Sequence, residues 1–408
     1  MELSTLLDTY FIDTLPNKRR GEDSILFEMN LERNLTNLCN DINNRTLQPT
    51  AYTFVSKNPK PREVFACDMG SRICQHYIEK RIRPILESAL IESTFNNRKG
   101  KGTTAAVNHL IEDIYDVSEG FNNDNCWIIK VDMRGYFPNA NQDIAYAQLE
   151  KLILDNYTGS DIDDLLYLLK VSIFSYPTEH CYKKSTPEEW QLIEPSKSLF
   201  HKDPGIGGAI GHLIWQCAMT YYINDVCHWL VDDCGLHITV YMDDITIVTN
   251  NKESTLALIP ELRNRLKNIG VTLHPNKFYC QHYKKGVEFL GHHIKMDRCY
   301  VNNRCKRNMM NKIDCYNKMV NLRNIDRFIS TINSYLGQFK TANGYRIVCC
   351  ALKRINPKWW QFVEYDKERI CIRPKEEYSY NNRIINHFNL QHYDRKKRDP
   401  GKDQSSGI

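Results

Sequence analysis

Three aspartates have the sequence context of a site for metal-assisted chemistry. Asp132 ends the apolar run CWIIKVD, and Asp243 and Asp244 form an acidic pair between runs rich in β-branched residues, HITVYM and ITIVT. Burying such a pair is costly unless a positive charge compensates it. Mg²⁺ takes hard oxygen ligands and is commonly held by one or two carboxylates and substrate phosphates. Two such ions about 3.5–4 Å apart can activate an attacking hydroxyl and stabilise a leaving oxygen. Taken alone, the pair could equally be a solvent-exposed turn.

The segments around these aspartates resemble a known enzyme family. YMDD, residues 241–244, resembles the YxDD box of reverse transcriptases, and VDMRGYFP, residues 131–138, resembles the acidic motif that precedes it there. The resemblance runs from about residue 18 to about residue 346. It is strongest to bacterial retroelement enzymes, both diversity-generating and antiphage-defence types, in PKPREVFACDMGSR, FNNRKGKGTTAAV, KSLFHKDPGIG and INSYLGQFK.

This resemblance implies an α+β right-hand polymerase, with fingers, a palm built on an antiparallel sheet with helices, and a helical thumb. It also implies roles for single residues. Asp132 and Asp243 would bind two Mg²⁺ ions, for which Mn²⁺ could substitute, Asp244 would be a supporting carboxylate, and the backbone carbonyl of Met133 would be a further ligand. Phe137 would be a steric gate that clashes with a ribose 2′-hydroxyl and so selects dNTPs. The alternative for Phe137 is a core aromatic.

Two basic segments could hold the triphosphate of an incoming nucleotide. RKGKGT, residues 98–103, places three cations and two glycines in six residues. Glycines let a backbone approach phosphates closely, and arginine can fork onto two phosphate oxygens. The resemblance puts Arg98 and Lys99 on the triphosphate, with Lys60 and Arg62 reaching it from a fingers hairpin. The alternative is a solvated basic loop, and no GxxxxGK[ST] loop is present.

The loop GIGGAIGHLIWQ, residues 205–216, departs from the family form LPIGNLTSQ. By resemblance it packs under the template base and the nucleotide, with Gly211 the candidate for close backbone approach and Gln216 for a polar contact. Ala209 and Trp215 are the notable departures. They favour antiphage defence over mutagenic retrohoming, unless Trp215 simply faces the palm core.

Two segments downstream of the acidic pair complete the expected site. Residues 271–279 and 287–294 read as a strand-like pair. By resemblance, Lys277 could act as general acid for the leaving pyrophosphate, with a surface lysine as the alternative. The segment VEFLGHH, residues 287–293, resembles the primer grip, a hairpin that positions the primer end.

The remaining sequence predicts the elements that position these residues. Residues 51–68 are typical of a β-hairpin, and residues 70–92 of a helix interrupted near Pro84. Residues 211–230 predict one long apolar helix, and residues 237–249 a hairpin with the acidic pair at its tip. The expected domain plan is a helical extension at 1–50, fingers at 51–125, a palm at 126–300 with a fingers insertion at about 173–204, a thumb at 301–350, and a basic C-terminal extension with a disordered tail at 351–408.

Composition bounds the class of protein. At roughly 100–200 residues per domain, 408 residues predict two to four domains or subdomains. Hydrophobic residues at 42% and charged residues at 25% exclude a disordered chain. No apolar run approaches the ~20 residues of a membrane span. Fifteen cysteines without a CxxC pair argue against a disulfide scaffold and a zinc protein, so we expect reduced, mostly buried thiols and a cytoplasmic location. The resemblance to bacterial retroelement enzymes implies that the cell is bacterial.

Charge is distributed unevenly along the chain. Residues 301–408 carry 22 Lys+Arg and 10 Asp+Glu, a net of +12, whereas the rest of the chain has a net of −7. A basic end on an acidic body predicts binding of a polyanion such as nucleic acid, with a solubilising tail as the alternative.

The sequence therefore predicts an RNA-directed DNA polymerase, a nucleotidyltransferase. Its expected partners are a cognate non-coding template RNA, a DNA product or primer, and dNTPs. An accessory protein or an oligomer is possible, and a membrane is not expected. Antiphage defence is the favoured role, a diversity-generating retroelement is the alternative, and a catalytically silent RNA-binding scaffold is the second alternative.

Overall fold

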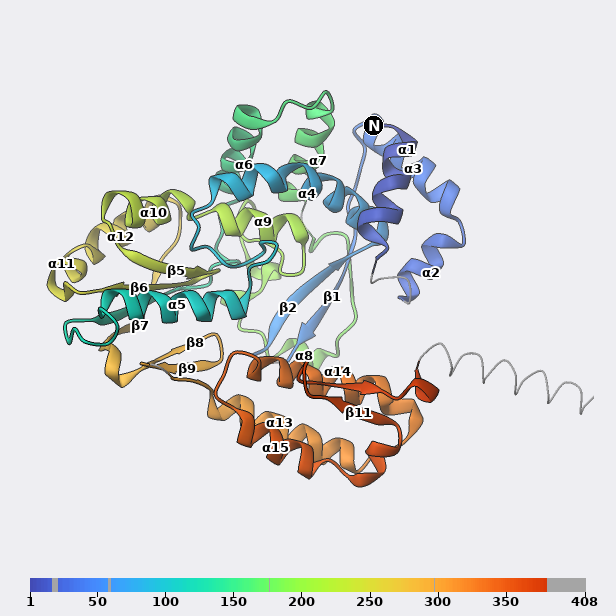
Figure 1. Ribbon diagram of the computed structural model, residues 1–408. Coiled ribbons are helices and arrows are strands. Elements are labelled where there is room, and N and C mark those ends of the chain that lie inside the picture. The colour runs from blue at the N-terminus through green and yellow to red at the C-terminus, as the bar shows by residue number, and fades with distance from the viewer. Residues whose placement is uncertain (17–20, 58–59, 176, 297, 380–408) are drawn as a thin grey trace, which may run out of the picture. The chain divides into compact units, whose positions relative to one another are not determined.

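The computed structural model describes residues 1–16, 21–57, 60–175, 177–296 and 298–379 (Figure 1). The chain divides into two compact units, Met1–His282 and Tyr283–Ile408. Each unit has its own hydrophobic core, so each is described by itself. No helix among the described residues is long and apolar enough to cross a bilayer.

A four-stranded antiparallel sheet lies at the centre of the first unit. Its strand order is β5 (His237–Tyr241), β6 (Asp244–Thr249), β3 (Trp127–Met133) and β7 (Leu273–His282). Ile128, Ile129 and Val131 of β3 are all buried, which is why that strand is apolar on both faces. Helix α5 (Thr103–Val117) packs against β5 and β6. The apolar run at 126–132 forms β3, and the predicted hairpin at 237–249 is confirmed.

A second sheet is built on the hairpin expected at residues 51–68. The predicted hairpin is confirmed as β1 (Ala51–Ser56) and β2 (Arg62–Cys67), which pair in antiparallel register. The insertion expected at about 173–204 adds a third strand, β4 (Cys181–Lys183), parallel to β1. Burial alternates along both hairpin strands, so one face of this sheet packs on the core and the other is open.

Helix α4 (Met69–Ala89) is continuous through Pro84, and the expected interruption is absent. Pro84 is exposed, whereas Ile82 and Leu86 on the same helix are buried in the core. Proline removes one backbone hydrogen bond at a cost of about 3 kcal/mol, and burial of the opposite helix face offsets that cost. Asp68 caps the first turn, accepting the Ser71 N–H at 2.7 Å.

The expected long helix at 211–230 is divided into α9 (Leu213–Tyr221), α10 (Asn224–His228) and the π-helical turn η4 (Trp229–Asp233). The break has a local cause. The Tyr222 carbonyl accepts the Gln148 amide at 3.2 Å, and the Asn224 amide donates to the Ala89 carbonyl at 2.9 Å. The Gln148 side chain thus satisfies a carbonyl that a continuous helix would pair internally, and the Asn224 side chain ties the break to the end of α4.

The other elements of the first unit are mostly helical, and the helical expectation for residues 1–50 is confirmed. They are α1 (Leu3–Asp8), η1 (Thr9–Thr14), α2 (Glu22–Glu28), α3 (Leu31–Asn43), α6 (Gln142–Asn156), α7 (Ile162–Phe174), α8 (Pro187–Trp190), η2 (Pro195–Lys197), η3 (Leu199–His201), α11 (Lys252–Ala257) and α12 (Ile259–Asn268).

The second unit begins with a β-meander and continues into helices. Its elements are η5 (Tyr283–Lys285), β8 (Val287–Phe289), β9 (His292–Lys295), β10 (Arg298–Val301), α13 (Asn303–Asn317), η6 (Leu322–Asn324), α14 (Ile325–Leu336), η7 (Gly337–Phe339), α15 (Tyr345–Arg354), η8 (Pro357–Gln361), β11 (Val363–Asp366), β12 (Cys371–Pro374) and η9 (Glu376–Tyr378). Its core continues past residue 350, because Trp359 is fully buried and stacks on Phe328 at 4.2 Å between ring centroids. The predicted disordered tail lies outside the described residues.

The strand-like segments expected at residues 271–279 and 287–294 are confirmed as strands, β7 for the first and the β8–β9 pair for the second. Strand β7 pairs with β3, and residues 287–294 fold on themselves as the β8–β9 hairpin. Leu290 and Gly291 both have positive φ, 46° and 85°, which a two-residue hairpin turn requires. The segment expected to be a primer grip is therefore a hairpin.

Candidate active site

The three aspartates meet where β3 ends beside the β5–β6 hairpin. Asp132 lies directly opposite Asp244 across the β3–β6 ladder. The Met133 N–H donates to the backbone carbonyl of Asp243 at 3.3 Å. All three aspartates are half-buried, and directly opposed strand residues have Cβ atoms about 4.5–5.5 Å apart. The fold thus brings together two acidic segments that are far apart in the sequence.

The electrostatics of this cluster show a concentration of negative charge. Burial raises the pKa of the Asp243 carboxyl above its ordinary value, and the charges of Asp244 and Asp132 raise it further. Lys130 offsets part of this charge, with its Nζ 3.2 Å from Asp244 Oδ1. Hard carboxylate oxygens that repel one another suit a divalent cation. Within the described ranges, however, no three His, Cys, Asp or Glu side chains already form a metal-binding cluster.

The turn that carries Asp243 is clamped by a residue that the sequence analysis missed. Met242 adopts a positive φ of 55°, an uncommon conformation for a residue with a side chain. Its N–H donates to Asn96 Oδ1 at 2.9 Å, and the Asn96 amide donates to the Thr220 hydroxyl at 2.6 Å. Asn96 is only 2% exposed. In the sequence, Asn96 only precedes the basic segment at residues 98–103, and no neighbouring residue indicates that it holds the acidic turn.

The loop around Asn96 is joined to the sheet by its backbone. The Val240 N–H donates to the Ser93 carbonyl at 2.9 Å, and the Phe95 N–H donates to the Val240 carbonyl at 3.0 Å. On the other side, the Asn97 amide donates to the Gln216 carbonyl at 3.0 Å. Residues 93–97 therefore connect β5 with α9 directly beneath the acidic turn.

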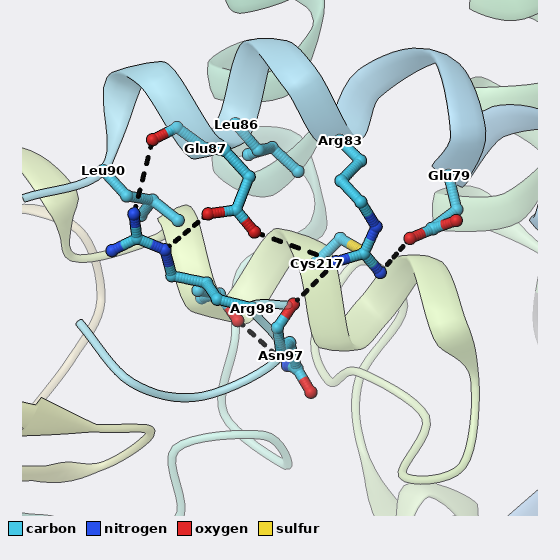
Figure 2. A pocket seen from close by; sticks show the side chains of 9 residues that line it. Glu79, Arg83, Leu86, Glu87, Leu90, Asn97, Arg98 and Cys217 are labelled. Carbon is cyan, nitrogen blue, oxygen red and sulfur yellow. Dashed lines mark hydrogen bonds and ion pairs between the residues drawn. The ribbon is translucent and has the colours of Figure 1, made fainter. Parts of the chain in front are cut away.

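Arg98 does not occupy the position expected of a triphosphate ligand. Its side chain is 6% exposed, and its Nε donates to Glu87 Oε2 at 2.7 Å. Its Nη1 donates to the carbonyls of Ile91 at 2.8 Å and Thr94 at 3.0 Å. Figure 2 shows the guanidinium turned toward the end of α4. The charge thus lies at the C-terminal end of α4, where cations are favourable, and satisfies carbonyls of the segment that follows the helix.

A surface cavity beside Arg98 contains none of the three aspartates. It lies between α4, α9 and the Asn97–Lys99 segment and is lined by Glu79, Arg83, Asn97, Arg98, Lys99, Leu213 and Cys217. Arg83 pairs with Glu79 and approaches Glu87 at 3.8 Å (Figure 2). These acids and bases neutralise one another, so the cavity has no strong charge of its own. Lys99 is exposed at this surface.

Two of the cations predicted to hold the triphosphate, Lys60 and Arg62, come from the hairpin segment at residues 51–68. Arg62 is exposed, and its charge lowers the pKa of Asp243, which places it within electrostatic reach of the acidic cluster. Lys60 is exposed two residues earlier. Lys277 falls within β7, but its side chain lies outside the described residues.

Phe137 and Tyr136 form an aromatic pair beside the acidic strand end. Phe137 is half-buried, and its ring meets that of Tyr136 edge-on at 6.1 Å. The Tyr136 hydroxyl donates to the Met219 carbonyl at 2.7 Å. The Phe137 carbonyl accepts the Gly208 N–H at 2.8 Å. Phe137 is thus held by its backbone, with part of its ring still accessible.

The loop before α9 is packed against the fingers hairpin. A Cβ on Gly211, whose φ is 102°, would lie 2.6 Å from the Phe65 carbonyl oxygen, so only glycine fits. Gly211 is exposed, and Gln216 is half-buried. Trp215 is 1% exposed and covers Gly208, so it faces the core, the alternative that the sequence analysis had left open.

Comparison with known protein families finds one family model that matches this chain. Residues 55–294, more than half of the chain, match the family model described as reverse transcriptase (RNA-dependent DNA polymerase). The chain belongs to the reverse transcriptase family. It is an RNA-directed DNA polymerase, a nucleotidyltransferase, with the α+β right-hand fold of that family. Reverse transcriptases generally use divalent metal ions, and they act on nucleic acid.

The solved structures to which the chain is similar include two telomerases. Telomerase from Candida albicans in complex with a fragment of telomeric RNA is 10% identical, with a TM-score of 0.44 over 83% of this chain and 67% of that one. Apo telomerase from Candida tropicalis is 10% identical, with a TM-score of 0.45 over 76% and 60%. This reverse transcriptase thus spans 67% and 60% of the lengths of those two chains. No curated protein sequence is significantly similar to it.

Proposed function

We propose that this reverse transcriptase copies a cognate non-coding RNA into DNA, with Asp132, Asp243 and Asp244 as its catalytic carboxylates. A primer 3′-hydroxyl attacks the α-phosphate of a dNTP, a new phosphodiester bond forms, and pyrophosphate leaves. The observation that carries the proposal is that the three aspartates meet at the end of β3. Asp132 lies opposite Asp244 on β6, and the Asp243 backbone carbonyl accepts the Met133 N–H of β3.

The acidic cluster fits a pair of divalent cations. Asp132 and Asp243 would hold both, with Asp244 in support and the Met133 carbonyl as a further ligand. These residues would hold Mg²⁺, or Mn²⁺ in its place, which would supply Lewis-acid activation of the attacking hydroxyl and stabilisation of the leaving oxygen. The ion pair with Lys130 holds the Asp244 carboxylate in place.

The remaining site residues bind and select the nucleotide. Arg62 and Lys60 reach the triphosphate from the fingers, and exposed Lys99 adds positive charge nearby. Lys277 supplies a proton to the departing pyrophosphate. Phe137 closes the space that a ribose 2′-hydroxyl would need. Arg98 is not among the nucleotide-binding residues, because its guanidinium already donates hydrogen bonds to Glu87 and to backbone carbonyls.

The open face of the fingers sheet suits the single-stranded template ahead of the copied base. Tyr52 of β1 and Tyr182 of β4 stand side by side, with ring centroids 5.9 Å apart, and Tyr182 is 68% exposed. Lys184 lies over the Tyr52 ring at 3.7 Å. Phe54 and Arg62 continue the same face by strand alternation toward the acidic cluster. Aromatic platforms with cations bind single strands, at about 1–3 kcal/mol per stacked base.

Substitution of Tyr182 tests this template surface. Tyr182→Ala should weaken binding of a primer–template with a long single-stranded RNA overhang by about 10-fold, consistent with one lost stacking contact. Binding of a blunt duplex should be unchanged. An equal loss of affinity for both substrates would show that Tyr182 does not bind the single-stranded overhang.

The second unit supplies the chemistry expected of a thumb. Exposed basic side chains are distributed along α13 and α14 and the turn between them, namely Arg304, Arg307, Lys312, Lys318, Arg323 and Arg327. Backbone phosphates dominate the affinity of proteins for duplexes. We therefore propose that this unit grips the primer–template duplex.

The biological role that we propose is antiphage defence in a bacterial cytoplasm. Its support is the altered loop before α9, although burial of Ala209 and Trp215 places both changes in packing rather than on the open surface. A defence island around the gene, with or without an accessory protein, is the expected neighbourhood. A template and variable repeat pair would instead indicate a diversity-generating retroelement.

Primer extension on an RNA template with dNTPs tests the activity. Asp243→Asn should reduce the rate by on the order of 10²–10³-fold, because metal stabilisation is worth several kcal/mol. Asp233→Asn is the matched control, since Asp233 is an exposed aspartate of η4 in the same unit. Extension by the Asp243→Asn, Asp244→Asn double variant at the control rate would support the scaffold alternative.

A further inference from the structure

The strand that carries Arg62 also carries a buried carboxylate. Glu63 is 5% exposed and lies opposite Val55 of β1 on the core side of the hairpin, whereas Arg62 before it is exposed. A carboxylate in such a place is costly to bury unless hydrogen bonds compensate it. Burial raises the pKa of the Glu63 carboxyl above its ordinary value, against the opposing effects of its hydrogen bonds and of the charge of Lys183. The proposed reaction gives this carboxylate no direct part, because it lies on the face away from the nucleotide.

Both carboxylate oxygens of Glu63 hold the start of one short turn, η3. The Ser198 hydroxyl donates to Glu63 Oε1 at 2.8 Å, and the Leu199 N–H donates to Oε2 at 2.7 Å. Ser198 is itself buried, and its side-chain oxygen also accepts the Phe200 N–H at 3.2 Å. Hydrogen bonds to an ionised carboxylate are stronger than those between neutral groups. The strand that carries Arg62 is thereby tied to η3.

The turn η3 in turn contacts the segment that carries Phe137. A Cβ on Gly207, whose φ is 104°, would lie 2.5 Å from the Leu199 side chain and 3.2 Å from the Pro138 carbonyl oxygen. Gly207 is therefore packed between them, where only glycine fits. The next N–H along the chain, that of Gly208, donates to the Phe137 carbonyl at 2.8 Å. The contacts of the buried carboxylate thus extend to the backbone of the residue proposed to select the sugar.

A second tie of β2 does not depend on Glu63. The Phe65 N–H donates to the Ile210 carbonyl at 2.8 Å, a bond between backbone groups alone. It holds β2 three residues beyond Arg62, which is the first residue of the strand. Substitution of Glu63 would therefore release the end of β2 that bears Arg62, while the rest of the strand stays attached.

We propose that Glu63 is a positioning residue that sets the spacing between Arg62 and Phe137. The inference rests on the proposed function, in which Arg62 binds the triphosphate and Phe137 excludes a ribose 2′-hydroxyl. Triphosphate and sugar belong to one nucleotide, so both contacts form together only when their spacing matches it. Glu63 itself touches neither nucleotide nor metal. Its loss should therefore weaken nucleotide binding and sugar selection together and leave the chemical step nearly intact.

Single-nucleotide incorporation on an RNA template, with dNTPs and with rNTPs, tests this role. Glu63→Gln should raise the KM for dNTPs by about 5-fold, less than Arg62→Ala does, because Arg62 is displaced rather than removed. The kcat should change by less than about 2-fold. The preference for dNTPs over rNTPs should fall by about 10-fold, since Phe137 no longer meets the sugar in register. Ser198→Ala removes one of the two hydrogen bonds, so it should change both quantities less, in the same direction, and it serves if Glu63→Gln does not fold.

A double variant and a matched control separate positioning from folding stability. Adding Glu63→Gln to Arg62→Ala should leave the KM of Arg62→Ala unchanged, because Glu63 acts on the triphosphate through Arg62. The control is Asp161→Asn, another carboxylate that accepts two hydrogen bonds, from the Tyr77 and Tyr157 hydroxyls at 2.6 Å each. It should lower the free energy of unfolding without changing the KM or the preference for dNTPs, since none of these three residues belongs to the proposed site.

Two results would overturn the inference and spare the proposed function. One is a wild-type KM and preference in Glu63→Gln while Arg62→Ala and Phe137→Ala show their effects. The other is an equal loss of preference in Asp161→Asn. If Arg62→Ala left the KM unchanged and Phe137→Ala left the preference unchanged, the proposed nucleotide site would be wrong, and the role of Glu63 would fall with it.

Discussion

Arg62 and Arg98 were assigned to the same triphosphate from sequence, and the structure separates them. Arg62 is exposed on a strand, and its charge acts on Asp243. Arg98 is 6% exposed and holds the end of α4 through Glu87 and backbone carbonyls. Strand alternation fixes the face on which Arg62 stands, whereas a glycine-rich loop leaves the direction of Arg98 open. A basic loop therefore shows its role only once its neighbours are known.

The largest expected effect is the loss of folding stability when Arg98 is replaced. Arg98→Ala should lower the free energy of unfolding by about 2–4 kcal/mol, because Glu87 and two carbonyls lose a buried charged partner. The KM for dNTPs of the folded enzyme should be unchanged. Lys99→Ala is the control, with an expected change within about 0.5 kcal/mol. Denaturant unfolding gives the first quantity. An unfolding free energy like that of the wild type with a raised KM would restore Arg98 to the triphosphate site.

Loss of Asn96 should affect catalysis rather than substrate binding. Asn96→Ala removes the acceptor that holds the Met242 N–H, so the turn that carries Asp243 loses its position. We expect kcat to fall by about 10²-fold, with little change in KM, because misplacement by about 1 Å has effects of that size. Steady-state extension on an RNA template separates the two constants. A raised KM with normal kcat would mean that the loop binds nucleotide after all.

Arg62 should show the opposite pattern to Arg98. Arg62→Ala should raise the KM for dNTPs by about 10-fold, which matches a charge-assisted hydrogen bond of about 1.5–3 kcal/mol with partial compensation by Lys60. Its unfolding free energy should change by less than about 0.5 kcal/mol. Arg62→Lys should recover part of the affinity. If Arg62→Ala destabilised the protein as much as Arg98→Ala, the distinction between a nucleotide-binding Arg62 and a structural Arg98 would be wrong.

The smallest effect concerns pH at the same end of α4 that Arg98 holds. His228 Nε2 lies 3.0 Å from the Ala89 carbonyl, and this contact raises the His228 pKa, with Asp232 adding to the rise. Protonated His228 therefore stabilises the fold below its unfolded-state pKa, and this stability is lost as pH rises through the raised folded pKa. His228→Gln should lower the unfolding free energy at pH about 6 by under about 1 kcal/mol and have less effect at pH about 8.5. Equal effects at both pH values would show that the charge does not contribute.

The sequence allowed the palm to be predicted because its signals are local. Apolar strands that end in aspartate, and a β-branched hairpin with an acidic tip, need little context. Strand β4 could not be found this way, since its residues lack alternation and it pairs with β1 from more than 120 positions away. The break after Tyr222 depends on Gln148, which lies on another helix. Asn96 also takes its role from distant partners, Met242 and Thr220. Arg98 takes its role from Glu87 on the preceding helix and from nearby carbonyls.

Manganese binding tests the central claim, that aspartates from separate segments form one metal centre. Electron paramagnetic resonance of the wild-type chain with primer–template and a non-hydrolysable dNTP should show two bound Mn²⁺ ions per chain. Asp132→Asn and Asp244→Asn should each lose at least one of them, whereas Asp233→Asn should bind as the wild type does. Unchanged Mn²⁺ binding in both Asp132→Asn and Asp244→Asn would contradict the account.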